Sequence, residues 1–387
     1  MFAASACSPK SGAQGNERLT VSKVAIRVDA SIAIGTGHVM RCLTLARALA
    51  DQGADVHFIS KDHAGNLNAY VRAAGFPVLE IHAEGGAAAV SPADPPHAGW
   101  LGGTWEADAG QTASHVAALG IDLLVVDHYA LDARWEAGVG IVPERIVVVD
   151  DLADRAHSCA MIVDANLGRR PTDYAAVARP GTVVLAGAEY ALLRAEFAAA
   201  RESSLVRRED SSLRRILVAM GGVDAFNATT RVLDALDAST LPDTCSVTIV
   251  LGSRAPWLDA VRKAAAGMRG SAEVLVDVTD MAELMASSDL AIGGAGVTAW
   301  ERCCLGLPTL IVTIAENQVA GAKALADAGA AGLVGGVEDV VSRLGALVED
   351  AARPGALAAM SRAASAVTDG KGVDRVVAHI QGLCRAG

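Results

Sequence analysis

Short runs of Val, Ile and Leu alternate with Ala-rich amphipathic stretches along most of the chain, and this alternation limits the possible folds more than any other feature. The alternation occurs as two series. Strands are expected at residues 24–28, 56–59, 78–81, 123–126 and 146–149 in the first series, and at residues 216–220, 247–251, 273–276, 290–292 and 309–312 in the second. Apolar runs of this kind are typical of parallel strands that helices cover on both faces. The sequence therefore predicts an α/β fold with two doubly wound Rossmann-like domains that face each other across a cleft.

The segments between these strands have the pattern of amphipathic helices. The clearest spans residues 39–52, where Leu43, Ala46 and Leu49 share one face. The second series is expected to contain helices at residues 229–236, 257–266, 281–287, 297–305 and 319–328. The expected organisation is a disordered tail over residues 1–22, a first domain over 23–200, a charged linker over 201–214 and a second domain over 215–387. Residues 84–104 are rich in Gly, Ala and Pro, which indicates a surface loop.

The composition excludes several classes of function. The net charge of −11 and the aromatic content of 4% argue against nucleic-acid binding, which uses basic grooves and stacking platforms. No run of apolar residues is long enough to predict a membrane span. The seven cysteines include no C-x-x-C pair, and the first 22 residues lack the apolar core of a signal peptide. These features favour a cytoplasmic protein with free thiols.

The turn after the first expected strand contains a candidate general base. Asp29 follows the strand, and Gly35 and Gly37 permit a tight turn. His38 then occupies the first turn of the next helix, whose positive end disfavours protonation, whereas a carboxylate such as Asp29 favours it. A neutral histidine here is suited to general-base catalysis, and the alternative is a capping or packing role. Arg41 is expected either to bind a phosphate or to pair with Asp29.

The end of the fourth expected strand gathers three polar side chains, Asp127, His128 and Tyr129. A carboxylate, an imidazole and a phenol at the end of a parallel strand can orient a water molecule or a sugar hydroxyl. The alternative is that Asp127 caps a helix and His128 lies on the surface. The sequence does not decide which of His38 and His128 is the base. Asp151, at the end of the next strand, is expected to support the site from behind.

A glycine-rich turn in the second series predicts a phosphate site. Gly293, Gly294 and Gly296 precede the helix expected at residues 297–305, and backbone N–H groups at such a helix start bind phosphate without a cation. The residues expected to bind substrate are Gly37 and Arg41 in the first series, and Gly222, Gly294, Ala295, Gly296, Val297, Glu301, Asn317 and Gln318 in the second. The alternative for Glu301 is a solvent-exposed position on its helix. No Asp-x-Asp triplet occurs, so neither a metal nor another cofactor is expected.

Several segments together resemble a known enzyme family. They are GTGHVMRCLTLA, VVDHYALDARWE, DDLADRAH, YALLRAEF, MGGVDAFNAT and GGAGVTAWERCCLGLPTL with the following AENQ. In this order they resemble the UDP-2,4-diacetamido-2,4,6-trideoxy-β-L-altropyranose hydrolases, the UDP-sugar hydrolases of pseudaminic acid biosynthesis. The resemblance extends from about residue 26 to about residue 318 and continues more weakly to the C-terminus. This family is similar to the GT-B glycosyltransferases, especially the N-acetylglucosaminyltransferase that forms lipid II.

The resemblance implies a metal-independent, inverting hydrolysis of a UDP-sugar, in which the C1–O bond breaks and UDP leaves. It implies His38 as the base, Tyr129 as the active-site phenol and Glu301 as the ligand of the uridine ribose. Residues 294–296 would bind the diphosphate, and Asn317 would contact the sugar or a phosphate. The first domain would bind the sugar, the second would bind UDP, and a monomer is expected. The alternatives are a GT-B glycosyltransferase, a UDP-sugar 2-epimerase and a non-catalytic sugar-nucleotide binder.

Overall fold

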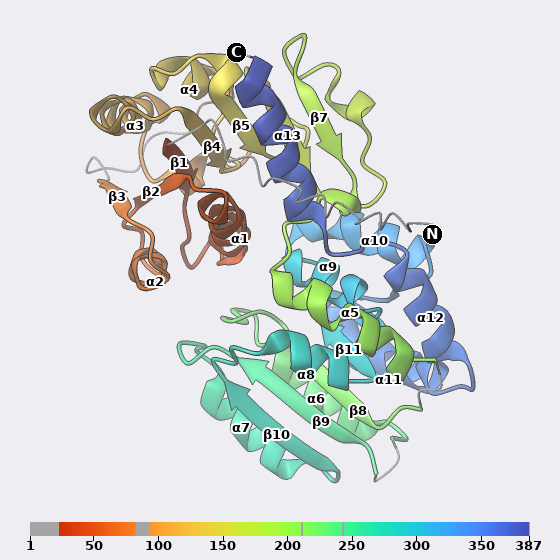
Figure 1. Cartoon of the computed structure of the whole chain (residues 1–387). Helices are drawn as coiled ribbons and strands as arrows, with labels where there is room; N and C mark the ends of the chain where they lie inside the picture. Colours follow the sequence, from red (N-terminus) through yellow and green to blue (C-terminus); the bar gives the residue numbers. More distant parts are fainter. Residues whose placement is uncertain (1–22, 83–90, 92, 210–211, 242–243, 387) are drawn as a thin grey trace, which may run out of the picture.

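The computed structural model describes residues 23–82, 91, 93–209, 212–241 and 244–386, which form two α/β lobes (Figure 1). The tail expected over residues 1–22 lies outside the described residues, as does part of the expected loop, residues 83–90 and 92. Each lobe contains one parallel sheet with helices packed against it. This arrangement confirms the predicted pair of doubly wound domains.

The first lobe is built on a seven-stranded sheet in the order β3-β2-β1-β4-β5-β6-β7, in which all neighbours are parallel. Its strands are β1 (Lys23–Val28), β2 (Asp55–Lys61), β3 (Val78–Ile81), β4 (Leu123–Asp127), β5 (Ile146–Val149), β6 (Met161–Asp164) and β7 (Val183–Ala186). Its helices include α1 (Gly37–Asp51), α2 (Asn68–Ala73), α3 (Trp105–Leu119), α4 (Ala133–Gly138) and the 3₁₀ turn η1 (Ala98–Leu101). The five expected strands are present, and the short strands β6 and β7 extend the sheet beyond the prediction.

The second lobe contains a six-stranded parallel sheet in the order β10-β9-β8-β11-β12-β13. Its strands are β8 (Arg215–Ala219), β9 (Ser246–Leu251), β10 (Ser271–Val276), β11 (Leu290–Gly293), β12 (Thr309–Thr313) and β13 (Gly332–Gly336). Its helices include α6 (Ala228–Ala238), α7 (Leu258–Gly267), α8 (Met281–Ser287), α9 (Val297–Cys304), α10 (Val319–Asp327), α11 (Val340–Ala351) and α12 (Ala356–Ser365). The 3₁₀ turn η5 (Glu316–Gln318) follows β12.

Both strand orders reverse direction at one point in the sheet. In the first lobe the reversal lies between β1 and β4, and in the second it lies between β8 and β11. Loops that follow the two strands at such a point diverge to opposite faces and leave a crevice at the carboxyl ends of the strands. The four turns that the sequence singled out, at His38, Asp127, Gly222 and Gly294, follow these four strands.

The expected domain boundaries differ from the structure at two places. The linker over 201–214 begins inside a helix, α5 (Ala195–Arg207), whose Phe197 packs with Ala299 and Trp300 of the second lobe. The last helix, α13 (Gly372–Ala386), returns to the first lobe and packs against α1 (Figure 1). Its apolar face, including Val376 and Ile380, belongs to the core of the first lobe. The chain therefore crosses between the lobes twice, and residues 372–386 belong to the first domain.

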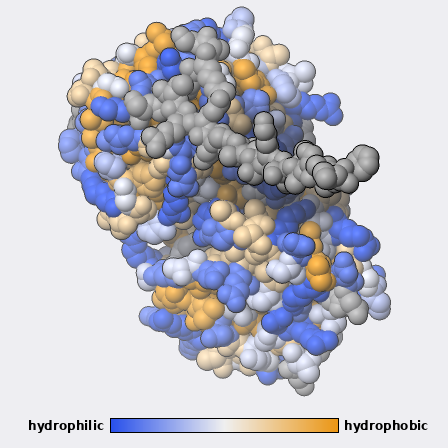
Figure 2. Space-filling view, in the orientation of Figure 1, coloured by the Kyte–Doolittle hydropathy of each residue, from blue (hydrophilic) through white to orange (hydrophobic). Residues whose placement is uncertain are grey.

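Burial on both faces of the first sheet explains the continuous apolar runs. Ile26 and Val28 of β1 pack in the core beneath α1, whereas Ala25 points to the other side, where it packs with Trp135 of α4. Hydrophilic and hydrophobic residues are interspersed over both lobes on the face that Figure 2 shows. Within the described stretches, no helix has the length and apolar character needed to cross a membrane.

Candidate active site

The reversal points of the two sheets bring two helix N-termini together. Helix α1 begins at Gly37 and α9 begins at Val297, and a Cβ atom added to Gly37 would lie 3.7 Å from Cγ2 of Val297. Neither helix start is capped by a side chain, and neither has an acidic residue in its first turn. The backbone N–H groups and the positive ends of both helix dipoles therefore remain available for an anion at this contact between the lobes.

His38 lies at the start of α1 against Asp127, the last residue of β4. Its Nδ1 is 2.6 Å from Oδ1 of Asp127, whereas the nearest nitrogen of Arg41 is 3.2 Å from Nδ1. Because an ionised carboxylate only accepts hydrogen bonds, the shorter contact assigns the proton to Nδ1. In the neutral ring the lone pair is then on Nε2, which is the tautomer that a general base requires.

Arg41 joins two acids of the site. Its Nε and Nη2 donate to the two oxygens of Asp127 at 2.6 and 2.7 Å, and Nη1 donates to Asp151 at 2.6 Å. The expected pairing with Asp29 does not occur, because Asp29 accepts hydrogen bonds from Arg27 at 2.6 and 2.8 Å. The expected contact of Arg41 with a phosphate would require one of its ion pairs to break, since its side chain is 91% buried among these acids.

The charges of this group follow from burial and from Arg41. Burial disfavours the ionised form of Asp127, but the charge of Arg41 and the hydrogen bonds from Arg41 and His38 outweigh it and hold the pKa of Asp127 well below its ordinary value. The hydroxyl of Tyr129 donates to Asp151 at 2.5 Å. Burial and the charge of Asp151 raise the pKa of Tyr129 well above its ordinary value. At neutral pH the site therefore contains an ionised Asp127 and a neutral phenol.

Two ring-bearing residues near His38, His97 and Trp100, were missed by the sequence prediction. The rings of Trp100 and Tyr129 stack with centroids 5.7 Å apart, and the His97 ring lies 4.5 Å from Trp100. The imidazole of His38 meets the edge of Tyr129 at 4.7 Å. Both missed residues lie in the segment predicted as a surface loop. An available signal was the presence of a His and a Trp in a Gly/Ala/Pro-rich stretch of a chain with only 4% aromatic residues.

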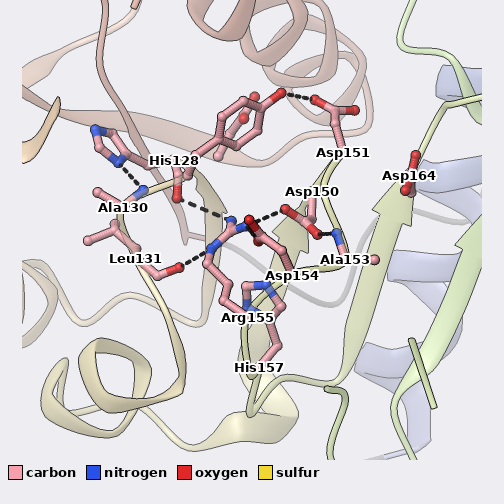
Figure 3. Close-up of polar contacts among 12 residues, drawn as sticks. His128, Ala130, Leu131, Asp150, Asp151, Ala153, Asp154, Arg155, His157 and Asp164 are labelled. Atoms are coloured by element: carbon pink, nitrogen blue, oxygen red, sulfur yellow. Dashed lines mark hydrogen bonds and ion pairs between the residues drawn. The ribbon is translucent and has the colours of Figure 1, made fainter. Parts of the chain in front are cut away.

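His128 lies beneath the site, with 3% of its surface exposed. Its Nδ1 accepts a hydrogen bond from the backbone N–H of Ala130 at 3.1 Å (Figure 3), and its Nε2 faces Oδ2 of Asp29 at 3.3 Å. The proton therefore resides on Nε2, which lies beside Asp29 but forms no hydrogen bond among the described residues. Burial lowers the pKa of His128, so the ring is neutral. Because neither nitrogen offers a lone pair to the cleft, the geometry favours His38 over His128 as the base.

A second layer of buried ion pairs supports the ends of β4, β5 and β6. Arg155 donates to Asp150 at 2.7 Å and to the backbone oxygens of Leu131 and His128 (Figure 3). The hydroxyl of Tyr174 lies 2.9 Å from Asp150 and 2.8 Å from Asp164, the last residue of β6. Burial and the nearby charge of Asp151 raise the pKa of Asp164 to about 6. The backbone oxygen of Asp151 accepts from Asn166 at 2.9 Å and from Arg169 at 2.8 Å, outside this group of ion pairs.

The glycine turn of the second lobe connects β11 to α9 as the sequence predicted. Gly294 is buried, whereas Ala295, Gly296 and Val297 are partly exposed. Oε1 of Gln318 faces the backbone N–H groups of Ala295 at 3.4 Å and of Ile314 at 3.2 Å, so this side chain orders the turn. Asn317 is exposed on η5, and Gly222 is exposed after β8, the strand paired with β11. These expected substrate-binding residues lie at one edge of the second sheet.

Glu301 is buried, in contrast to the alternative of a solvent-exposed helix residue. Its Oε1 lies 3.3 Å from Arg194, which precedes α5 in the segment that joins the lobes. Burial outweighs this ion pair and raises the pKa of Glu301. Glu301 therefore connects α9 to the crossing between the lobes. In the part of the chain that the structure describes, no three His, Cys, Asp or Glu side chains converge as a metal site.

Comparison with known proteins places these features in context. A model of the glycosyltransferase family 28 C-terminal domain matches residues 215–376. The chain is 34% identical over 183 residues to the spore coat polysaccharide biosynthesis protein SpsG of Bacillus subtilis, which covers 44% of the chain and 50% of that protein. The chain thus spans about half the length of this relative.

Two further proteins resemble the chain over most of its length. It is 24% identical over 307 residues to the UDP-2,4-diacetamido-2,4,6-trideoxy-beta-L-altropyranose hydrolase of Campylobacter jejuni, which covers 79% of the chain and 97% of that protein. The solved structure of MurG from Acinetobacter baumannii superposes with a TM-score of 0.65 at 18% identity, and covers 93% of the chain and 99% of MurG. These findings confirm the GT-B-like fold and the similarity to the hydrolase that the sequence motifs indicated.

Proposed function

We propose that the chain hydrolyses a UDP-sugar, with UDP-2,4-diacetamido-2,4,6-trideoxy-β-L-altropyranose as the substrate. The observation that carries the proposal is the Nε2 lone pair of His38 beside the paired N-termini of α1 and α9. A base for water and a site for a diphosphate, side by side, are the two elements that this hydrolysis needs. The similarity to the Campylobacter hydrolase over 79% of the chain supports both the reaction and the sugar.

The base would act through the His38–Asp127 pair. Nε2 of His38 accepts a proton from a water molecule while the water oxygen attacks C1 of the sugar. The C1–O bond breaks, its electron pair leaves with the β-phosphate of UDP, and the anomeric configuration inverts. Asp127, 2.6 Å from Nδ1, stabilises the imidazolium that forms, and Arg41 keeps the carboxylate in place. A general base of this kind contributes roughly 10²–10⁴ in rate.

The second lobe would stabilise the leaving group. The N-terminus of α9 offers backbone N–H groups, and a charge at a helix N-terminus gains roughly 0.3–2 kcal/mol. Donors that are already in place at the leaving phosphate lower the barrier further, because they need no rearrangement as negative charge develops. UDP is a good leaving group, so no acid is required on its oxygen. The helix starts, which have no acidic residue in their first turns, would therefore suffice to stabilise the departing phosphate through their N–H groups.

A GT-B glycosyltransferase is the second candidate, favoured by the match of residues 215–376 to the glycosyltransferase family 28 C-terminal domain. The same base could deprotonate a sugar or lipid hydroxyl instead of water. Incubation of the UDP-sugar without an acceptor separates the two functions, because a hydrolase releases UDP in proportion to the sugar consumed. A UDP-sugar 2-epimerase would instead return an epimerised UDP-sugar.

The decisive experiment follows the reaction of the purified chain by NMR, with UDP release and the anomer formed as readouts. We expect His38→Ala to lose roughly 10²–10⁴ in turnover and still to bind UDP. His115→Ala is a matched control, because His115 lies on α3 against the backbone of Glu80, away from the cleft. Near-normal turnover by the His38 variant would remove this residue from the mechanism. Retention of configuration would contradict direct attack by water.

A further inference from the structure

Five arginines in the described residues are at least nine-tenths buried: Arg27, Arg41, Arg155, Arg208 and Arg302. Three of them form ion pairs with two aspartates each, which are Asp29 and Asp108, Asp127 and Asp151, and Asp150 and Asp154. Arg208 donates instead to Ser204 Oγ and to the backbone oxygens of Leu305, Ser288, Met285 and Ala286. Three of these arginines therefore have carboxylate counter-ions, and the N–H groups of Arg208 are satisfied by neutral oxygens.

Arg302, in contrast, has few partners. Its Nη2 donates to the backbone oxygen of Gly294 at 2.5 Å, and its Nη1 contacts Oγ1 of Thr298 at 3.3 Å. Its Nε has no hydrogen-bond partner. The guanidinium forms no ion pair with a carboxylate among the residues that the structure describes. The nearest acid in the sequence, Glu301, pairs with Arg194. The side chain is 2% exposed, and burial lowers its pKa to about 10.

The guanidinium of Arg302 lies directly behind the glycine turn. A Cβ atom added to Gly293 would lie 2.7 Å from its Nη1, so only glycine leaves room for the cation there. The hydrogen bond to Gly294 directs that carbonyl toward Arg302. Because the peptide group is planar and trans, the N–H of Ala295 points the opposite way. Arg302 thus orients the turn, and its charge adds to the positive end of α9.

A buried charge without a counter-ion is costly, and an anionic ligand that binds beside it offsets part of that cost. We propose that Arg302 is a positioning residue whose charge is balanced by the diphosphate of the nucleotide bound on the other side of the glycine turn 293–296. The inference rests on the proposed nucleotide-sugar function and adds a residue to it. Arg302 does not touch the reacting atoms. It holds the N–H groups of the turn in place and supplies the positive charge that a metal ion would otherwise bring to the diphosphate.

The test compares Arg302→Met with Arg208→Met, the matched buried arginine outside the turn. Binding of UDP and of inorganic pyrophosphate is measured by calorimetry, and thermal melting is measured with and without UDP. We expect Arg302→Met to weaken UDP and pyrophosphate about tenfold or more, since the lost interaction involves a charge in a buried setting. Without ligand its melting temperature should equal or exceed that of the wild type, because an unbalanced buried charge has been removed.

Arg208→Met should show the opposite pattern, with a lower melting temperature and unchanged UDP affinity, because its hydrogen bonds hold the ends of α8 and α9. Arg302→Lys keeps the charge, so we expect its UDP affinity to lie between those of the wild type and Arg302→Met. If Arg302→Met melts lower, as Arg208→Met does, and binds UDP normally, Arg302 is only structural and the inference is wrong. UDP binding without UDP-sugar hydrolysis would overturn the proposed reaction and leave this inference standing.

Discussion

Replacement of Asp127 by asparagine is the sharpest perturbation of the proposed site, because one atom changes and the shape is kept. The carboxylate accepts hydrogen bonds from His38 at 2.6 Å and from Arg41 at 2.6 and 2.7 Å. An amide has only one accepting oxygen. Because Arg41 donates to both oxygens of Asp127, the amide nitrogen meets a guanidinium donor in either orientation. Only the orientation in which the nitrogen faces His38 gives it an acceptor in return, Nδ1 of the imidazole.

This orientation moves the proton of His38 from Nδ1 to Nε2 and abolishes the base. A hydrogen bond to a charged partner is worth about 1.5–3 kcal/mol, which is a factor of roughly 10–150 in rate when it is lost from the transition state. The wrong tautomer adds to this loss, since Nε2 can no longer accept the proton of water. For Asp127→Asn we therefore expect kcat to fall by about 10³-fold, with the affinity for UDP unchanged.

The matched control is Asp150→Asn, which removes a carboxylate that is equally buried and also paired with an arginine, Arg155. Asp150 does not contact His38. Both variants should lose about 3 kcal/mol of unfolding free energy, since each leaves a buried arginine underpartnered. Only Asp127→Asn should lose turnover in a single-turnover assay of UDP release. Equal losses in the two variants would show that general destabilisation, not the tautomer of His38, limits the rate.

Two further predictions concern charge. The pKa of Asp164 is about 6 in the folded chain against an ordinary 3.8, so folding favours its protonated form, and this stabilisation, full below pH 4, disappears as the pH rises through 6. Asp164→Asn should therefore gain up to about 3 kcal/mol relative to the wild type between pH 4 and pH 7.5, and a constant difference in melting temperature over that range would refute the shift. Turnover should survive treatment with EDTA, because backbone N–H groups and Arg302 are proposed to replace a metal; a large loss that Mg²⁺ or Mn²⁺ restores would contradict this.

Apolar runs predicted most of the strands. β6 and β7 were missed although each is as long as β3 and β5, which were predicted, so length does not explain these two omissions. β13 was missed because three of its five residues are glycine. The helix α13 shows a different limit. Its apolar face was readable, but the sequence does not say which lobe that face covers. Only the second crossing of the chain, after α12, brings Val376 and Ile380 to the first lobe.

The sequence predicted which turns contribute residues to the site, but it did not predict which side chains contact each other there. His38 and Asp127 are 89 positions apart, and they meet because β1 and β4 are neighbours in the sheet. Of the two roles expected for Arg41, the pairing with Asp29 is absent because Asp29 pairs with Arg27, an arginine of the preceding strand that the sequence pattern does not mark as a competitor. His97 and Trp100 were missed because loop residues obey no periodicity that would place them beside His38.

The charges of the two lobes match the two charges that the proposed transition state develops. In the first lobe two carboxylates, Asp127 and Asp151, share the single guanidinium of Arg41, which leaves these three side chains with a net negative charge. In the second lobe the start of α9 is positive, and so is Arg302, which pairs with no carboxylate among the described residues. Positive charge on the sugar ring would then face the acidic lobe, and negative charge on the leaving phosphate would face the cationic turn. In the proposed reaction the fold would thus polarise the C1–O bond along the line between the lobes, whose helix starts approach each other at Gly37 and Val297.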